Sequence, residues 1–461
     1  MRFQKGRVKE MRSRTRDADM TQGSIFRHMV AFAVPMMMGL LFQQLYNTVD
    51  TIVVGQFVGK AALAAVGSTG AIINTLVGFS AGLSTGSSVV ISQCYGAHDY
   101  RKLGKAVHTT LCITFLMAIA ATLLGRLLTG PLLRMMSTPA DVFDEAKIYL
   151  DIYFSGIAGL LIYNMGSGIL RAVGDSRRPL YFLLFSATMN TVLDLLFVIV
   201  FKLGIRGVAY ATILSQFVSA LLILLVLTRD HGPYGLRWKQ LSIDREMVGR
   251  IFSIGLPGGI QQALTSFSNV FVQSYINFFG SACMAGWSSY NKLDIFLFLP
   301  AQAIAMASTT FVGQNYGAKQ MKRAKEGVRD SLIMSIVCTA TLAVVVMIFA
   351  EPLIRLFTAE KDVMEYGVYF IRRISPFYVA CCFNQNYGAA LRGIGSAKVP
   401  MVIMLFSFVF FRQLFLLVVK LLGHSLIGVS MAYPAGWIMC STLLFVFYRR
   451  SALYKAEDVA A

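Results

Sequence analysis

Two acidic side chains lie deep inside long apolar stretches of this chain, where a charge is costly. Asp50 lies seven residues from Phe57 and Asp194 seven residues from Phe201, so each acid lies roughly 10 Å below the predicted outer end of its stretch. A carboxylate in hydrocarbon is expensive unless it is paired, hydrated or protonated. Two like charges at one depth also favour a proton on one of them. We therefore expect these acids to serve a function rather than only to tie helices together.

Two neutral side chains add oxygen atoms at similar depth. Asn190 precedes Asp194 by four residues, which places both on one face of a helix. Thr212 lies five residues from Gly207. Taken alone, a single hydroxyl most often has the structural role of hydrogen-bonding between packed helices. Carboxylate, carboxamide and hydroxyl oxygens suit Na⁺, or a carboxyl that binds and releases a proton. The sequence predicts a Na⁺ or H⁺ coupling site at Asp50, Asn190, Asp194 and Thr212.

A second group of charged residues lies in later apolar stretches. Asp294 is near the middle of one stretch, Lys292 is two residues before it, and Arg412 lies in another. Residues two apart on a helix do not face each other, so Lys292 and Asp294 each need another partner, and Arg412 is a candidate for Asp294. A structural salt bridge and a role in binding or gating a substrate are both open for these three residues.

The composition indicates where these residues must lie. The chain is 56% hydrophobic and 14% charged, with a mean hydropathy of +0.63, which is too apolar for a water-soluble fold of 461 residues. Apolar stretches of about 20 residues or more, the length a helix needs to cross a bilayer, occur near 28–57, 62–92, 105–129, 148–170, 180–201, 207–228, 250–276, 283–311, 328–350, 366–390, 399–422 and 427–448. We expect an all-α membrane protein with twelve transmembrane helices.

The two halves of the chain are copies of each other. SQCYGA at 92–97 and GQNYGA at 313–318 are 221 residues apart, and the same spacing relates LRAVGD at 170–175 to LRGIG at 391–395. A duplicated half in so apolar a chain is typical of a transporter built from two related six-helix bundles.

Pro35 and Pro257 occupy matching places near the starts of the first and seventh stretches. Proline removes a helix hydrogen bond and permits a bend. The bend is either static, as packing requires, or responds to the charge of Asp50 on the same helix.

Basic residues fall mainly in the loops of one side, which indicates a multi-pass protein of the cell membrane with both termini in the cytoplasm. This bias accounts for the net charge of +19 without nucleic acid, for which no binding module is present. The predicted organisation is a basic cytoplasmic tail at 1–27, a first lobe at 28–228, a cytoplasmic linker at 229–249, a second lobe at 250–448 and a tail at 449–461.

Enzymatic and nucleotide-dependent functions find no support in the residues. The phosphate-binding pattern fails because Gly59 and Lys60 are followed by Ala61, and the cysteines and histidines lack the spacing of a metal or catalytic site. We expect neither an enzyme nor a cofactor beyond a coupling ion. The expected partners are small organic cations or other amphiphiles and membrane lipid, and we expect a monomer.

With VISQCYGA at 90–97, FVGQNYGA at 311–318 and the LRAVGD and LRGIG motifs, nearly the whole chain resembles the multidrug and toxic compound extrusion (MATE) family. The resemblance implies a V-shaped pair of lobes that alternate access and export organic cations in exchange for Na⁺ or H⁺. Asp50 on the first span, Asn190 and Asp194 in MNTVLD, and Thr212 in AYATIL resemble the family's first-lobe cation site.

The second-lobe acids of the NorM branch, expected on the seventh and tenth spans, have no match, because both spans lack Asp and Glu. The resemblance therefore favours the DinF-like branch. The alternative is a lipid-linked precursor flippase of a related two-lobe fold, which needs a large basic cavity. Lys292 and Arg412 are the chief basic candidates for it, and the first lobe is acidic.

Overall fold

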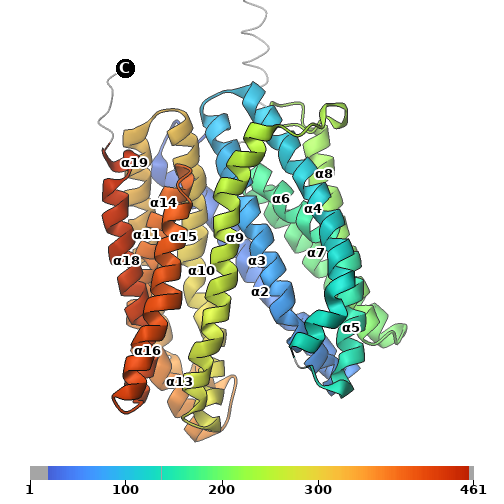
Figure 1. The fold of residues 1–461 in the computed structure, drawn as a ribbon, viewed down its shortest axis with the longest axis vertical. Helices are drawn as coiled ribbons and strands as arrows, with labels where there is room; N and C mark the ends of the chain where they lie inside the picture. The colour runs from blue at the N-terminus through green and yellow to red at the C-terminus, as the bar shows by residue number, and fades with distance from the viewer. Residues whose placement is uncertain (1–18, 137, 456–461) are drawn as a thin grey trace, which may run out of the picture. The chain divides into compact units, whose positions relative to one another are not determined.

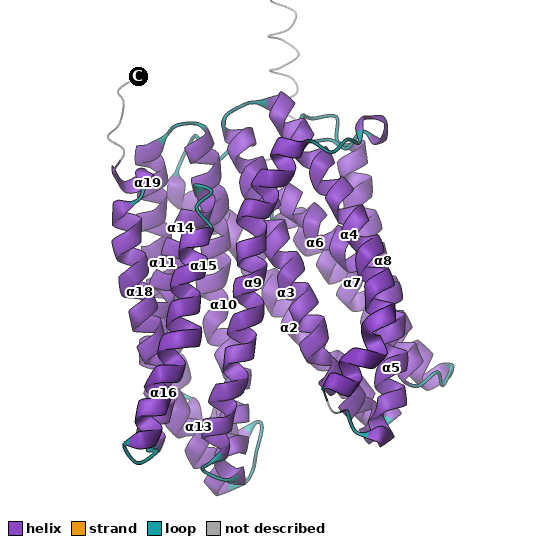
Figure 2. Ribbon diagram, viewed as in Figure 1, coloured by secondary structure: helices purple, strands orange, loops and turns teal. Residues whose placement is uncertain are grey.

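The computed structural model describes residues 19–136 and 138–455, so residues 1–18 of the first predicted tail and residues 456–461 of the second lie outside it. Within those ranges the chain forms helices joined by short loops and contains no strand (Figure 2). It divides into two compact units. Residues 19–22 and 38–255 form unit 1, and residues 23–37 and 256–455 form unit 2. The divisions fall inside two helices, α2 (Ile25–Val53) and α9 (Arg245–Asn277).

In unit 1, α3 packs against α5 and α6, and α7 packs against α8 (Figure 1). Its remaining elements are η1 (Val54–Val58), α3 (Lys60–Gly96), α4 (Tyr100–Met135), α5 (Ala140–Ser155), α6 (Ile157–Ala172), α7 (Arg177–Leu195), η2 (Leu196–Val200), α8 (Ile205–Arg229) and η3 (Trp238–Gln240).

Unit 2 packs α10 against α11, α13 and α14, and α14 against α18. Its elements beyond α9 are α10 (Ser281–Gly317), α11 (Met321–Ile348), α12 (Ala350–Arg355), α13 (Lys361–Ile374), η4 (Ser375–Phe377), α14 (Tyr378–Gly393), α15 (Lys398–Leu405), η5 (Phe406–Phe411), α16 (Arg412–Leu421), α17 (Leu426–Ser430), α18 (Ala432–Arg450) and α19 (Ala452–Lys455).

Helix boundaries repeat at the spacing found in the sequence, which confirms the duplication. Helices α3 and α10 are both 37 residues long, and both their first and their last residues are 221 positions apart. The starts of α5 and α13, and of α7 and α15, differ by the same number. The two units are therefore the same bundle built twice.

The duplicated YGA motif ends a helix. His98 and Lys319 follow the two copies and adopt the left-handed backbone region, with φ of 54° and 59°. The next backbone N–H groups then turn back to the helix, at 3.1 Å from Asp99 to the Cys94 carbonyl and 2.8 Å from Gln320 to the Asn315 carbonyl. The most conspicuous repeat in the sequence is thus a helix stop.

Each of the twelve predicted apolar stretches coincides with one helix or with a run of consecutive helices. Eight helices of the described residues are long and apolar enough to cross a membrane one by one, and the pair α5 and α6, bent by 49°, makes nine if it counts as one span. The chain is a multi-pass membrane protein.

Small residues let α3 approach α9 closely within unit 1. A Cβ added at Gly86 would lie 2.5 Å from the Ile251 carbonyl oxygen and 2.7 Å from Gly255 Cα, and both are backbone atoms that cannot swing aside. Gly104 in α4 faces open space, with nothing within 4 Å of an added Cβ.

We expect Gly86→Ala to destabilise the protein by about 1–3 kcal/mol, because the methyl group must separate two backbones. Gly104→Ala is the matched control, and it should raise stability by about 0.5–1 kcal/mol through helix propensity. In detergent, the apparent Tm of Gly86→Ala should lie below that of the native chain, and the apparent Tm of Gly104→Ala should lie above it. Equal values would show that α3 and α9 do not pack as described.

Candidate functional site

Helices α2, α7 and α8 of unit 1 bring the four predicted coupling residues to one place. Asn190, Asp194 and Thr212 are 1%, 0% and 4% exposed, and Asp50 is half-buried. With its carboxamide oriented to satisfy its neighbours, Asn190 donates to Asp194 Oδ2 at 3.0 Å and accepts from the Thr212 backbone N–H at 3.2 Å. The Thr212 hydroxyl donates to the Val208 carbonyl oxygen at 3.0 Å, within its own helix.

The two carboxyl groups are direct neighbours. Asp50 and Asp194 lie within hydrogen-bonding reach of each other, and the Oδ1 atom of each is buried without a hydrogen-bond partner. Ionised carboxylates only accept hydrogen bonds, so this contact requires a proton or a cation between them. None of the ion pairs of the described residues involves either acid. The cluster therefore has an intrinsic demand for one positive charge.

Tyrosines surround this cluster, and sequence reasoning missed them. Tyr46 interacts with both acids and with Thr212, and Tyr149 of α5 interacts with both acids. Tyr46 precedes Asp50 by four residues, the spacing that pointed from Asn190 to Asp194. That spacing was the available signal. The hydroxyls provide further neutral oxygen chemistry beside the carboxyl pair.

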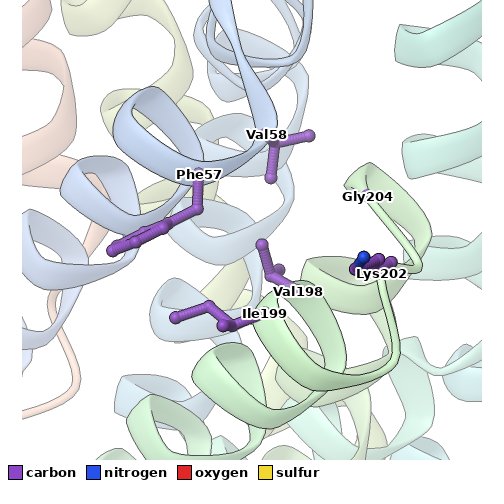
Figure 3. Close-up of a pocket in the computed structure, with 6 residues that line it drawn as sticks. All are labelled: Phe57, Val58, Val198, Ile199, Lys202 and Gly204. Carbon is purple, nitrogen blue, oxygen red and sulfur yellow. The ribbon is translucent and has the colours of Figure 1, made fainter.

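Each acid lies just before a π-helical turn. Helix α2 passes into η1 four residues after Asp50, and α7 passes into η2 two residues after Asp194. Such turns leave backbone groups less regularly paired and often occur at functional sites. Between the two turns lies a pocket of about 330 Å³ lined by Phe57, Val58, Val198, Ile199, Lys202 and Gly204, with the Lys202 amine at one side (Figure 3).

The oxygen set fits a hard cation or a transferable proton. Na⁺ is bound by oxygen ligands such as those of two carboxyls, a carboxamide and nearby hydroxyls. A carboxyl pair can also share one proton. No group of three or more His, Cys, Asp and Glu side chains in the part of the chain described here could hold a metal. The roles of these four residues remain predictions.

In unit 2 the predicted pairing of Arg412 with Asp294 is wrong. Asp294 accepts from the Tyr290 hydroxyl at 3.2 Å, and that hydroxyl also meets the hydroxyl of Tyr378 at 3.2 Å. Tyr290 lies one helical turn before Asp294, so the hydrogen-bond partner of this acid comes from its own helix. Lys292 instead lies over the Phe357 ring, 5.1 Å from its centroid.

Arg412 is 2% exposed and turns toward α9. It donates to Ser268 Oγ and to Asn269 Oδ1, both at 2.8 Å, and its guanidinium lies 4.7 Å from the centroid of the Tyr433 ring. The duplication spacing maps Thr212 onto Tyr433 and Thr191 onto Arg412. Unit 2 thus holds a fixed cation at the counterpart of Thr191, about one helical turn before Phe415, which is the counterpart of Asp194.

Pro35 and Pro257 lie inside α2 and α9, and neither ends its helix. Each leaves one backbone carbonyl without its usual helical donor, so bending is permitted at both points. A response of the Pro35 bend to Asp50 remains a prediction.

Comparison with known proteins agrees with the duplicated architecture. The MatE family model matches residues 35–196 and 257–416, one match in each half. The probable multidrug resistance protein YpnP of Bacillus subtilis is 30% identical over 437 residues, covering 94% of this chain and 96% of its own. The probable multidrug resistance protein NorM of Thermotoga maritima is 26% identical, covering 92% of each chain.

Solved structures share the fold over nearly its full length. A MOP superfamily transporter from Pyrococcus furiosus superposes with a TM-score of 0.90 at 25% identity, covering 96% of this chain and 99% of its own. Two family matches, one in each copy of the bundle, account for most of the described helices. This chain belongs to the MatE family of multi-pass membrane transporters.

Proposed function

We propose that this protein is a secondary active multidrug antiporter that exports small organic, mostly cationic, compounds in exchange for Na⁺ or H⁺. The observation that supports the proposal is the contact between Asp50 and Asp194, two neighbouring carboxyls with no basic partner among the described residues. Two relatives described above carry the name multidrug resistance protein, which supports the class of substrate.

The coupling follows from charge neutrality in a site of low dielectric. When the cluster lacks a proton or Na⁺, its negative charge must be balanced by another cation, and an organic cation can serve. A coupling ion that enters satisfies the carboxyl pair and removes that attraction. The ion shifts the equilibrium between conformations only as far as it binds one of them more tightly.

Coupling resides in the first unit alone. In unit 2, Phe415 takes the place of Asp194, and Arg412, three residues earlier, supplies a permanent positive charge that is already hydrogen-bonded to Ser268 and Asn269. A second exchangeable cation there would meet electrostatic repulsion. We therefore propose one coupling site per chain, at Asp50, Asn190, Asp194 and Thr212.

The remaining assignments are part of the same proposal. The protein acts as a monomer in the cell membrane with both termini in the cytoplasm, needs no cofactor or nucleotide, and takes the DinF-like form of the family. The alternative, a lipid-linked precursor flippase, requires basic side chains to hold a diphosphate. The carboxyl pair in unit 1 disfavours this alternative.

Asp50→Asn should abolish export driven by an ion gradient while the protein still folds, because one carboxyl of the pair can no longer ionise. The test is movement of a fluorescent organic cation in proteoliposomes under a Na⁺ gradient and, separately, a proton gradient. Asp151→Asn is the matched control, since that acid only pairs with Lys147 on the same helix at 3.1 Å. Full gradient-driven export by Asp50→Asn would refute the proposed site. No export by the native chain under either gradient would favour lipid-linked substrates.

Arg412→Gln should leave the ion dependence of export unchanged and lower the apparent Tm by a few degrees. The variant loses charged hydrogen bonds, each worth about 1.5–3 kcal/mol, but touches none of the coupling residues. The ion concentration that gives half-maximal export is the quantity to measure. A shift of tenfold or more would show that unit 2 takes part in coupling.

Pro35→Ala should slow export severalfold without loss of stability, because α2 regains a backbone hydrogen bond and becomes stiffer where the bend is proposed. Pro257→Ala on α9, a helix that carries none of the coupling residues, is the control and should slow export less. Initial rates in proteoliposomes, with apparent Tm measured in parallel, make the comparison. Equal rates for Pro35→Ala and the native chain would mean that the bend is static.

A further inference from the structure

The segment at 236–245, which we call the linker foot, is bound firmly to unit 1. His108 of α4 is 5% exposed and accepts at Nε2 from the Arg237 backbone N–H at 3.1 Å, while its Nδ1 donates to the Gly104 carbonyl oxygen at 2.6 Å. Behind it, the Leu236 backbone N–H donates to the Leu227 carbonyl oxygen at 2.7 Å. The start of the foot is therefore held by both α4 and α8.

The other end of the foot is held equally well. Lys105 donates to Asp244 Oδ2 at 2.6 Å, and the Thr109 hydroxyl accepts from the Asp244 backbone N–H at 3.0 Å. Asp244 Oδ1 also accepts from the backbone N–H of Glu246 and Met247, which caps the start of α9. The Lys105 hydrogen bond, together with these N–H groups, holds the pKa of the Asp244 carboxyl below its usual range.

Despite these restraints, the foot exposes large apolar side chains. Trp238 is 49% exposed and Ile243 is 54% exposed. Three basic side chains on the foot, Arg237, Lys239 and Arg245, are also exposed. A loop pinned at both ends has no freedom to hide these side chains, so they must meet whatever lies beside the protein.

The position of Trp238 indicates what that neighbour is. Its ring stacks on Phe115 of α4, with centroids 6.3 Å apart and planes at 27°. Phe115 lies five residues past the polar run His108 to Thr110 near the start of this membrane-spanning helix, which is roughly 7 Å further along the helix axis. Further along the helix, Leu116, Ile119 and Leu123 are 56%, 60% and 66% exposed, as lipid-facing residues are.

We propose that the linker foot is a membrane-interface anchor that inserts Trp238 and Ile243 into the adjacent leaflet and binds the anionic headgroups of its phospholipids through Arg237, Lys239 and Arg245. Tryptophan prefers the level between headgroups and acyl chains, and basic residues close to a membrane attract anionic lipid. Because the foot is bound to α4 and α8, this anchor holds unit 1 in that leaflet. The inference is independent of what the protein transports.

Tryptophan fluorescence tests the insertion directly, because the chain has 3 tryptophans. Trp287→Phe combined with Trp437→Phe leaves Trp238 as the only emitter. In vesicles whose phospholipids carry bromine near the headgroup, emission should be quenched at least twofold, and aqueous iodide should quench less than it does in detergent. If this variant does not fold, the difference in quenching between the native chain and Trp238→Phe measures the same signal. Absence of bromine quenching, or full access to iodide in vesicles, would overturn the proposal.

A second measurement tests the headgroup preference. Brominated phosphatidylglycerol should quench Trp238 severalfold more than brominated phosphatidylcholine at equal bromine content. The preference should disappear in the triple variant Arg237→Gln, Lys239→Gln, Arg245→Gln, and should survive in Lys361→Gln with Lys420→Gln, which removes exposed charges from unit 2. Equal quenching by both lipids in the native sequence would overturn the lipid-binding part.

Discussion

The contact between Asp50 and Asp194 is the constraint on which our functional account depends. Two carboxyls placed together among buried side chains cannot both be charged without a cation, and the described residues supply no basic partner. Asn190 donates a hydrogen bond to one oxygen of Asp194 and accepts one from the Thr212 backbone N–H of α8. One oxygen on each acid remains open. In the proposed mechanism, a mobile positive charge completes this site.

Duplication gives the chain two copies of one bundle, which carry different polar residues. The second copy repeats the helices of the first almost residue for residue, with α3 and α10 starting and ending at the same spacing. At the counterpart of Thr191 it places Arg412, which donates hydrogen bonds to Ser268 and Asn269 and lies over the face of Tyr433. In the proposed mechanism, one copy therefore carries an exchangeable charge and the other a permanent one, and the two units respond differently to the coupling ion.

Local periodicity was enough to predict much of this from the sequence. The apolar lengths located the helices, the constant spacing located the duplication, and the four-residue step paired Asn190 with Asp194. Tyr46 precedes Asp50 by the same four residues, so this spacing also predicts that Tyr46 lies beside the acid. Contacts between distant helices were not predictable, because spacing within one stretch does not reveal which helices pack together. Arg412 therefore hydrogen-bonds to Ser268 and Asn269 and not to Asp294. The linker is likewise bound to unit 1 through His108 and Lys105.

Binding of a fluorescent organic cation at equilibrium, measured by anisotropy over separate series of Na⁺ concentration and pH, tests the central claim most directly. If ion and substrate compete for the charge of the Asp50 and Asp194 pair, linkage requires that the substrate Kd rise close to tenfold for each tenfold rise in the coupling ion above its own Kd. The account predicts that slope in one of the two series for the native chain and a flat response in Asp194→Asn. A native chain whose substrate affinity is independent of both ions would contradict it.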